Sequence, residues 1–304
     1  MIQLESNRLR VEIPLPGEAP NTSYRFDRAG FVAEVVLDGL VRFCATEPQN
    51  LRHPSSGGRG LCNEYRFPIC ENTQIGEYFP KFGIGLYRKE EEGKFIFHKR
   101  YQDVLPFDIQ VAHTDFSATF TTLPHNCQGY GLQTIKKIIV SDNTLTIEVI
   151  ATNTGDKPLC FEEFCHNFLS IDGMAIGSDY SLTLPQIQDL GTERLNNRSG
   201  GRPGSMRGMG KGLTFCEYSA IDTDFAIDPD TLDDTESFCW HMVHKGAKAS
   251  VSCLDGFKPS KIAIWAVDHM FCPEIVHTVS LEVGQSHAWK RTWTFDRQHA
   301  ASWT

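Results

Sequence analysis

The sequence lacks any long apolar run. None approaches the roughly 20 residues that a membrane-spanning helix needs, and the first residues, MIQLESNRLRVEIP, do not contain the apolar core of a secretion signal. Basic residues are also few, because 29 lysines and arginines stand against 38 acidic residues, which gives a formal charge of -9. That charge repels phosphate backbones and anionic lipid surfaces. We therefore expect a cytoplasmic protein that binds neither nucleic acid nor membranes.

Motifs for metals, disulfides and phosphates are missing as well. The ten cysteines include no CxxC pair and are expected to be reduced and mostly buried. Cys165 precedes His166, but neighbours on a strand point to opposite faces, so they make a poor nucleophile and base. His241 and His244 would also lie on opposite faces, without a third ligand at zinc-site spacing. In the segment GKG, Gly212 replaces the Ser or Thr of a phosphate-binding loop, and we expect neither metal nor cofactor.

Helical periodicity is nearly absent, and no Pro/Gly/Ser-rich linker divides the chain. Alternating apolar and polar residues predict strands in the ranges 1–13, 30–45, 94–123, 132–151 and much of the last third. A hairpin turn is predicted at 141–143, and a second hairpin at a sheet edge over 280–295, with its turn at Gly284. The sequence thus predicts one all-β domain over residues 1–304, as a monomer or homodimer.

A long irregular segment is expected from residue 54 to residue 88. Loops of this length in compact domains are usually functional or disordered, and the aromatic residues here argue against disorder. The alternative is a surface Ω-loop packed by its own aromatic side chains. The segment carries polar residues suited to ligand binding, namely Arg59, Asn63, Arg66, Lys81 and Arg88.

Two titratable residues stand out in apolar surroundings. His166 lies in the aromatic strand LCFEEFCHNFL, where the alternative is a core histidine bonded to a neighbouring carbonyl. Glu274 lies in DHMFCPEIV, directly after Pro273, which should be excluded from a central ladder position. We expect desolvation to raise the pKa of Glu274, which suits a proton acceptor that works near neutrality.

These residues carry a resemblance to a known family. The strand TLTIEVIATN, the turn NTGDKP and the following His166 resemble the galactose mutarotase (aldose 1-epimerase) superfamily. The CPE motif at 272–274 ahead of LEVGQSHAW is similar to the hexose-6-phosphate epimerase branch. The resemblance extends over residues 30–296 and is most specific at 140–172 and 262–295.

The resemblance implies a large antiparallel β-sandwich, a supersandwich with few helices, that holds a sugar ring in a concave sheet. His166 would be the general acid and Glu274 the general base, on opposite sides of the pyranose. Together they would open and close the ring and so interconvert the α and β anomers of an aldohexose or related sugar. This chemistry requires no metal or cofactor.

The resemblance also suggests substrate-binding residues. Arg59 and Arg88 match arginines of the sugar-phosphate branch and could grip a phosphate bidentately; alternatively they bind neutral hydroxyls or pair with Glu64 and Glu77. The family's early His-Gly motif is not kept, since Ile84 precedes Gly85. The remaining substrate-binding candidates are Lys81, Asn63, Trp265 and His269.

Two other functions stay open. A non-catalytic carbohydrate-binding or sensing protein would keep the cupped sheet and its aromatic residues without turnover. A binder has no need for a buried acid and base together, so His166 and Glu274 favour the isomerase. A polysaccharide lyase is disfavoured, because lyases built on such sandwiches usually also have a helical domain that this chain lacks.

Overall fold

The computed structural model describes residues 1–19, 21, 24–48, 55–187, 196–197, 206–215, 223–227 and 235–297. Over these ranges the chain forms antiparallel strands in four sheets and a short 3-10 helix, η1 (Pro68–Asn72). No helix in the described part of the chain has the length and apolar character needed to cross a membrane. The all-β sandwich that the sequence predicts is confirmed.

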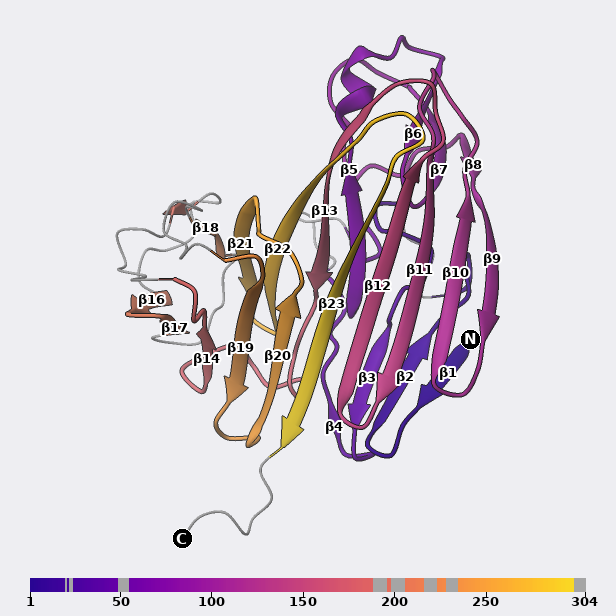
Figure 1. Ribbon diagram of the computed structural model, residues 1–304. Coiled ribbons are helices and arrows are strands. Elements are labelled where there is room, and N and C mark those ends of the chain that lie inside the picture. Colours follow the sequence, from indigo (N-terminus) through magenta and orange to yellow (C-terminus); the bar gives the residue numbers. More distant parts are fainter. Residues whose placement is uncertain are drawn as a thin grey trace, which may run out of the picture.

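Two large sheets form the sandwich (Figure 1). In spatial order, the ten-stranded sheet consists of β16 (Met206–Met209), β17 (Gly212–Phe215), β14 (Tyr180–Thr183), β19 (Phe238–His244), β20 (Ala249–Asp255), β23 (Ser286–Arg297), β12 (Thr144–Asn153), β11 (Leu132–Ser141), β10 (Ser117–Leu123) and β9 (Asp108–His113). The six-stranded sheet consists of β15 (Asn196–Asn197), β18 (Thr223–Ile227), β21 (Lys261–Val267), β22 (Met270–Leu281), β13 (Leu159–Asn167) and β5 (Leu61–Arg66).

Two smaller sheets complete the fold. One consists of β1 (Ile2–Glu5), β2 (Leu9–Ile13), β3 (Glu34–Leu37) and β4 (Val41–Arg42), and the other of β6 (Tyr78–Lys81), β7 (Gly85–Arg88) and β8 (Val104–Pro106). A bridge between Val32 and Leu61 joins the segment before β3 to β5. The first small sheet therefore continues the layer of the six-stranded sheet.

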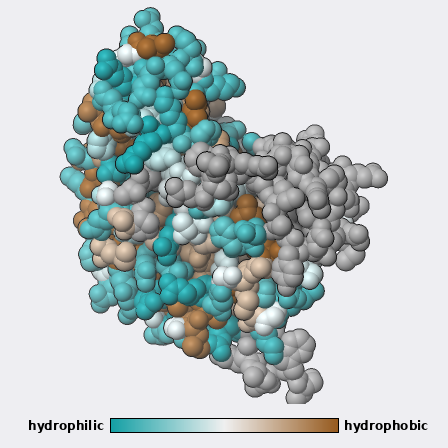
Figure 2. All heavy atoms as spheres, turned by 180° about the vertical axis from the view of Figure 1, so that it is seen from behind, coloured by the Kyte–Doolittle hydropathy of each residue, from teal (hydrophilic) through white to brown (hydrophobic). Residues whose placement is uncertain are grey.

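The main core lies between the large sheets. Strand β12 alternates strictly, with Leu145, Ile147 and Val149 buried in this core, where Phe161 of β13 and Ile275 of β22 meet them. Burying such side chains contributes roughly 1.5–3 kcal/mol each. Hydrophilic side chains cover much of the face seen in Figure 2. The period-2 pattern therefore fixes which side of each strand faces the core.

A chain of five charged side chains and one amide also crosses this core. Lys136 on β11 binds Asp27 and donates to the Asn63 amide oxygen at 2.9 Å; Asn63 in turn donates to Glu163 on β13. Arg291 on β23 donates to Glu163 at 3.0 Å and to Asp255 at 2.9 Å. We call these six residues the inner network; each is at most 2% exposed.

Three details of the prediction were wrong. The range 54–88, from residue 55 on, is not an irregular loop but contains β5, η1, β6 and β7. Strands β22 and β23 do not form an edge hairpin, because they belong to different sheets and β23 lies between β20 and β12. Pro273 does lie in an inner strand. Its missing N–H is tolerated because the pairing of β13 with β22 ends at Phe164–Val276. The Asn167 side chain donates a hydrogen bond to the Pro273 carbonyl.

Candidate functional site

Strands β13 and β22 bring His166 and Glu274 together. The pairing of β13 with β22 reaches Phe164 opposite Val276, and each titratable residue lies two positions beyond that pair. Both side chains therefore point away from the core, to the outer face of the six-stranded sheet. The His166 Nε2 atom lies 3.0 Å from Glu274 Oε1, and the residues are only 3% and 9% exposed.

Aromatic rings enclose the His166 imidazole. Phe168 stacks on it with 3.9 Å between ring centroids and an interplanar angle of 6°. Phe26 and Trp265 present their edges, each with centroids 5.7 Å away. Nδ1 is buried and has no hydrogen-bond partner among the described residues. Ring packing, rather than a second hydrogen bond, therefore fixes the orientation of the imidazole.

The electrostatics of Glu274 differ from the sequence prediction. Burial raises the pKa of the Glu274 carboxyl. His166 above all, and then Arg66 and Arg25, lower it by more, so that the net pKa is about 2. The predicted net increase was therefore wrong. The sequence showed the apolar neighbours of Glu274, but not the cations that the fold brings to it. Glu274 is a carboxylate at neutral pH and is in contact with the His166 imidazole.

The resemblance also implied that His166 and Glu274 lie on opposite sides of a sugar ring, and the structure differs from this. The two groups lie side by side on the same sheet and are in direct contact. A ligand must therefore approach both from one side or separate them.

A second group of charges adjoins the pair. The Arg25 guanidinium donates to Glu64 at 2.9 Å and lies over the Phe26 ring. Lys81, only 6% exposed, donates to the Tyr65 carbonyl at 2.6 Å and lies 3.6 Å from Glu64. Burial lowers the pKa of Lys81 to about 8, against the effect of Glu64. Burial raises the pKa of Glu64, but Arg25, Arg66 and Lys81 lower it to about 2.

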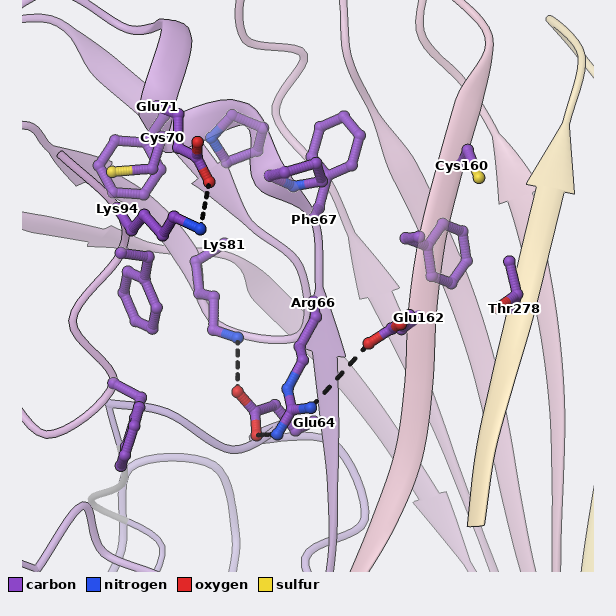
Figure 3. Close-up of a pocket in the computed structure, with 16 residues that line it drawn as sticks. Glu64, Arg66, Phe67, Cys70, Glu71, Lys81, Lys94, Cys160, Glu162 and Thr278 are labelled. Atoms are coloured by element: carbon purple, nitrogen blue, oxygen red, sulfur yellow. Dashed lines mark ion pairs between the residues drawn. The ribbon is translucent and has the colours of Figure 1, made fainter. Parts of the chain in front are cut away.

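Glu64, Lys81 and Arg66 line a cavity of about 490 Å³ (Figure 3), whose lining residues do not include His166 or Glu274. Arg66 contributes to its wall, packs 4.3 Å from the Phe164 ring centroid and lowers the pKa of Glu274. It therefore borders both the cavity and the pair.

Sequence reasoning named Lys81, which lines this cavity, and Trp265, which contacts His166. It missed Arg25 and Phe26, and it named Arg66 only as one of the polar residues of the 54–88 segment. Reading residues 61–66 as a strand would have placed Cys62, Glu64 and Arg66 on one face, the same face as His166. Nothing local marks Arg25 and Phe26, which reach the site only through the fold.

Other predicted binding residues lie elsewhere. Asn63 faces the core and belongs to the inner network, because it alternates with Glu64 along β5. Arg59 donates to the Ala33 carbonyl at 3.0 Å and lies 3.8 Å from Glu34. Arg88 is half exposed and donates to the Gly76 carbonyl at 2.9 Å. The two arginines bind separate acceptors, so they do not form the expected clamp.

His269 lies in the turn between β21 and β22. Its ring nitrogens lie 2.6 Å from Asp268 Oδ1 and 3.0 Å from the Thr46 carbonyl. No group of three or more His, Cys, Asp or Glu side chains suited to a metal ion occurs in the described part of the chain.

Comparison with known proteins gives no match in sequence and clear matches in structure. Neither a protein-family profile nor a curated protein sequence matches the chain. A galactose mutarotase-like protein from Lactobacillus casei ATCC 334 superposes with a TM-score of 0.59 at 14% identity, over 97% of this chain and 100% of that one. The GalM/aldose epimerase homologue from C. elegans gives 0.58 at 12% identity, over 98% and 99%.

A galactose mutarotase related enzyme from Lactobacillus acidophilus gives a TM-score of 0.57 at 13% identity, over 97% of this chain and 96% of that one. At such identities the likeness speaks for the fold and not for activity or substrate. Together with the two-sheet topology, these matches show that the chain has the galactose mutarotase-like fold.

Proposed function

We propose that the protein is an aldose 1-epimerase-type isomerase that interconverts the α and β anomers of an aldohexose or related sugar. The observation that supports this most is the buried contact of 3.0 Å between His166 and Glu274 on the outer face of the six-stranded sheet. Burying an ionisable pair is costly unless it is well bonded, and such pairs concentrate at functional sites. The aromatic residues around it suit a sugar ring, whose faces are apolar.

The reaction needs two proton transfers at neighbouring atoms. One group removes the proton of the C1 hydroxyl while another protonates the ring oxygen, and after rotation the ring closes from the other face of the aldehyde. Both oxygens are bonded to C1, so two side-by-side groups can serve them. Glu274 would act as the base and His166 as the acid, and each positioned group typically contributes about 10²–10⁴-fold.

Ligand binding would also tune the base. A carboxylate with a pKa of about 2 accepts a proton weakly, and the contact with His166 lowers the pKa of Glu274 most. A sugar whose oxygens enter between the two side chains breaks their direct contact. The pKa of Glu274 then rises, and the pair becomes an acid and a base aimed at adjacent oxygens.

One observation favours the rival function, a non-catalytic carbohydrate-binding or sensing protein. The contact between His166 and Glu274 is closed, and a carboxylate that stays paired is a poor base. If the ion pair persists when sugar binds, the site recognises the ring without opening it.

Polarimetry of freshly dissolved α-aldoses distinguishes the two functions. The isomerase should accelerate mutarotation of at least one neutral or phosphorylated aldose, and His166→Asn or Glu274→Gln should abolish most of the acceleration. Sugar binding without any acceleration across the panel would support the binding protein instead. Circular dichroism of each variant checks that the fold is kept.

A further inference from the structure

Lys81 of β6 is a buried lysine at the wall of a cavity. Its side chain is 7% exposed, and its Nζ atom donates to the Tyr65 carbonyl at 2.6 Å. Nζ also lies 3.6 Å from Glu64 Oε1, toward which the side chain is directed in Figure 3, and 5.0 Å from the centroid of the Phe95 ring. Lys81, Glu64 and Phe95 all line the cavity of about 490 Å³. The nitrogen therefore stands among groups that a ligand in this cavity would touch.

Lys81 shares its carboxylate partner with two arginines. Arg25 lies 2.9 Å and Arg66 lies 3.6 Å from Glu64 Oε2, so three cations meet at one carboxylate. Arg66 also lies 3.9 Å from the half-exposed Glu162, whereas Arg25 and Lys81 are both buried beside Glu64. Positive charge is therefore in excess around Glu64, and such an excess disfavours the protonated form of a buried lysine.

The consequence is a lysine that is partly neutral near pH 7. Burial above all, helped by Arg25 and Arg66, lowers the pKa of Lys81 to about 8 against the opposing effect of Glu64. At neutral pH such a lysine holds roughly a hundredfold more neutral amine than one with the ordinary pKa of about 10.4. The neutral amine is the form that attacks a carbonyl carbon, and an apolar pocket or a neighbouring cation is what activates a lysine for this chemistry.

Aromatic rings form much of the cavity wall around this amine. Phe67, Phe79, Phe95, Phe97 and Phe161 all line it. Phe79 and Phe95 pack edge to face, with ring centroids 6.4 Å apart. A flat apolar group can bury its faces against such rings, while a carbonyl at its end reaches the one reactive nitrogen. The wall therefore favours an aldehyde with an aromatic body over a small polar aldehyde.

We propose that Lys81 is a Schiff-base-forming residue that condenses with an aldehyde whose aromatic body lies in this cavity. The nitrogen lone pair adds to the carbonyl carbon, and one N–H proton passes to the oxygen, which gives a carbinolamine. The C–O bond then breaks, the hydroxyl leaves as water with the second N–H proton, and a C=N bond remains. No oxidant or reductant takes part. The step does not depend on the proposed isomerase, since neither His166 nor Glu274 lines the cavity.

Reductive trapping near pH 7 tests this assignment on the intact chain. Hydrocinnamaldehyde is the probe, sodium cyanoborohydride reduces the imine to a stable secondary amine, and peptide mass spectrometry gives the labelling rate of each lysine. We expect Lys81 to be labelled faster by about tenfold or more than Lys94, which lines the same cavity but is 82% exposed, and than the exposed Lys137. Hydrocinnamyl alcohol, which has the same body and no carbonyl, should slow the labelling of Lys81 and leave that of Lys137 unchanged.

Two variants assign the fast reaction to this residue. Lys81→Arg keeps a positive charge and a donor for the Tyr65 carbonyl, but a guanidinium stays protonated and forms no imine. The fast phase of labelling in the intact mass spectrum should therefore disappear in Lys81→Arg and remain in Lys94→Arg, the matched control. The proposal is overturned if Lys81 of the wild type is labelled no faster than Lys94, or if the alcohol gives Lys81 no protection. Both of these results come from the wild type, so they do not depend on the folding of a variant.

Discussion

Charged groups on the two sides of the six-stranded sheet behave in opposite ways. On the outer face, the carboxyls of Glu64 and Glu274 have pKa values lowered to about 2, because neighbouring cations outweigh the effect of burial. On the inner side, Asp255 belongs to β20 of the facing ten-stranded sheet, and burial raises its pKa to about 7, even though Arg291 opposes the increase. Along β5, alternation places Asn63 of the inner network one residue from Glu64 of the outer charges.

The difference lies in what surrounds each set. Glu64 on the outer side lines a cavity, whereas each residue of the inner network is at most 2% exposed. We therefore expect substitutions on the outer face to reduce activity and those on the inner face to reduce stability.

The largest effect is expected for Glu274→Gln. Loss of the base should lower kcat for anomerisation by about 10²–10⁴-fold, with little change in thermal stability, because the amide oxygen can still accept from His166. NMR exchange measurements give the rate and calorimetry the melting temperature. Glu148→Gln, on the exposed face of β12, is the control. A variant that keeps full activity would remove Glu274 from the chemistry.

On the inner face, Lys136→Met should cost about 3–5 kcal/mol of unfolding free energy, because it leaves Asp27 buried without its cation. The double variant Lys136→Met with Asp27→Asn should recover part of that loss. Urea unfolding measures both. If the single variant loses activity but no stability, the inner network is not structural.

The pH dependence of stability tests the contrast in sign. Asp255 binds a proton more tightly in the folded state, so its contribution is full below about pH 4 and is lost as the pH rises through about 7. Glu64 and Glu274 contribute stability above about pH 4.5 that is lost as the pH falls towards 2.

The slope from one such group is at most about 1.4 kcal/mol per pH unit. Urea unfolding from pH 4 to pH 8 should show a smaller decline in Asp255→Asn than in the wild type. An identical pH profile in the two proteins would contradict the raised pKa of Asp255.

The smallest effect is expected for Arg88→Ala. Its side chain is 52% exposed and lies 3.7 Å from Asp103, and exposed ion pairs contribute about 0–1 kcal/mol. Activity towards every sugar should be unchanged, whereas Arg66→Ala should weaken it. A selective loss of activity towards a hexose phosphate in Arg88→Ala would restore the phosphate-binding role that the sequence resemblance suggests.

Sequence reasoning succeeded where local patterns determine the outcome. The alternation in 144–151 and the turn at 141–143 predict β12 and its pairing with β11, and the structure confirms both. His166 and Glu274 could be selected because each is an ionisable residue in an apolar strand. Their contact could not be derived, since it depends on the β13–β22 register, which long-range packing sets.

The failures share a physical cause. The range 54–88 contains many glycines and charges and gives a weak strand signal, yet its strands pair with distant segments. Asn63 was assigned to the wrong face, because a segment read as a loop has no defined alternation. The hairpin predicted at 280–295 failed because strands adjacent in sequence can belong to different sheets of a sandwich.

The most direct test of the central claim, that His166 and Glu274 act as one proton-transfer unit, is a double-mutant cycle on the anomerisation rate. For the best aldose of the panel, His166→Asn and Glu274→Gln should each reduce kcat by orders of magnitude. The double variant should be hardly slower than the slower single variant, because residues that act as a unit are not additive. Losses that multiply in the double variant, or wild-type rates in either single variant, would contradict the claim.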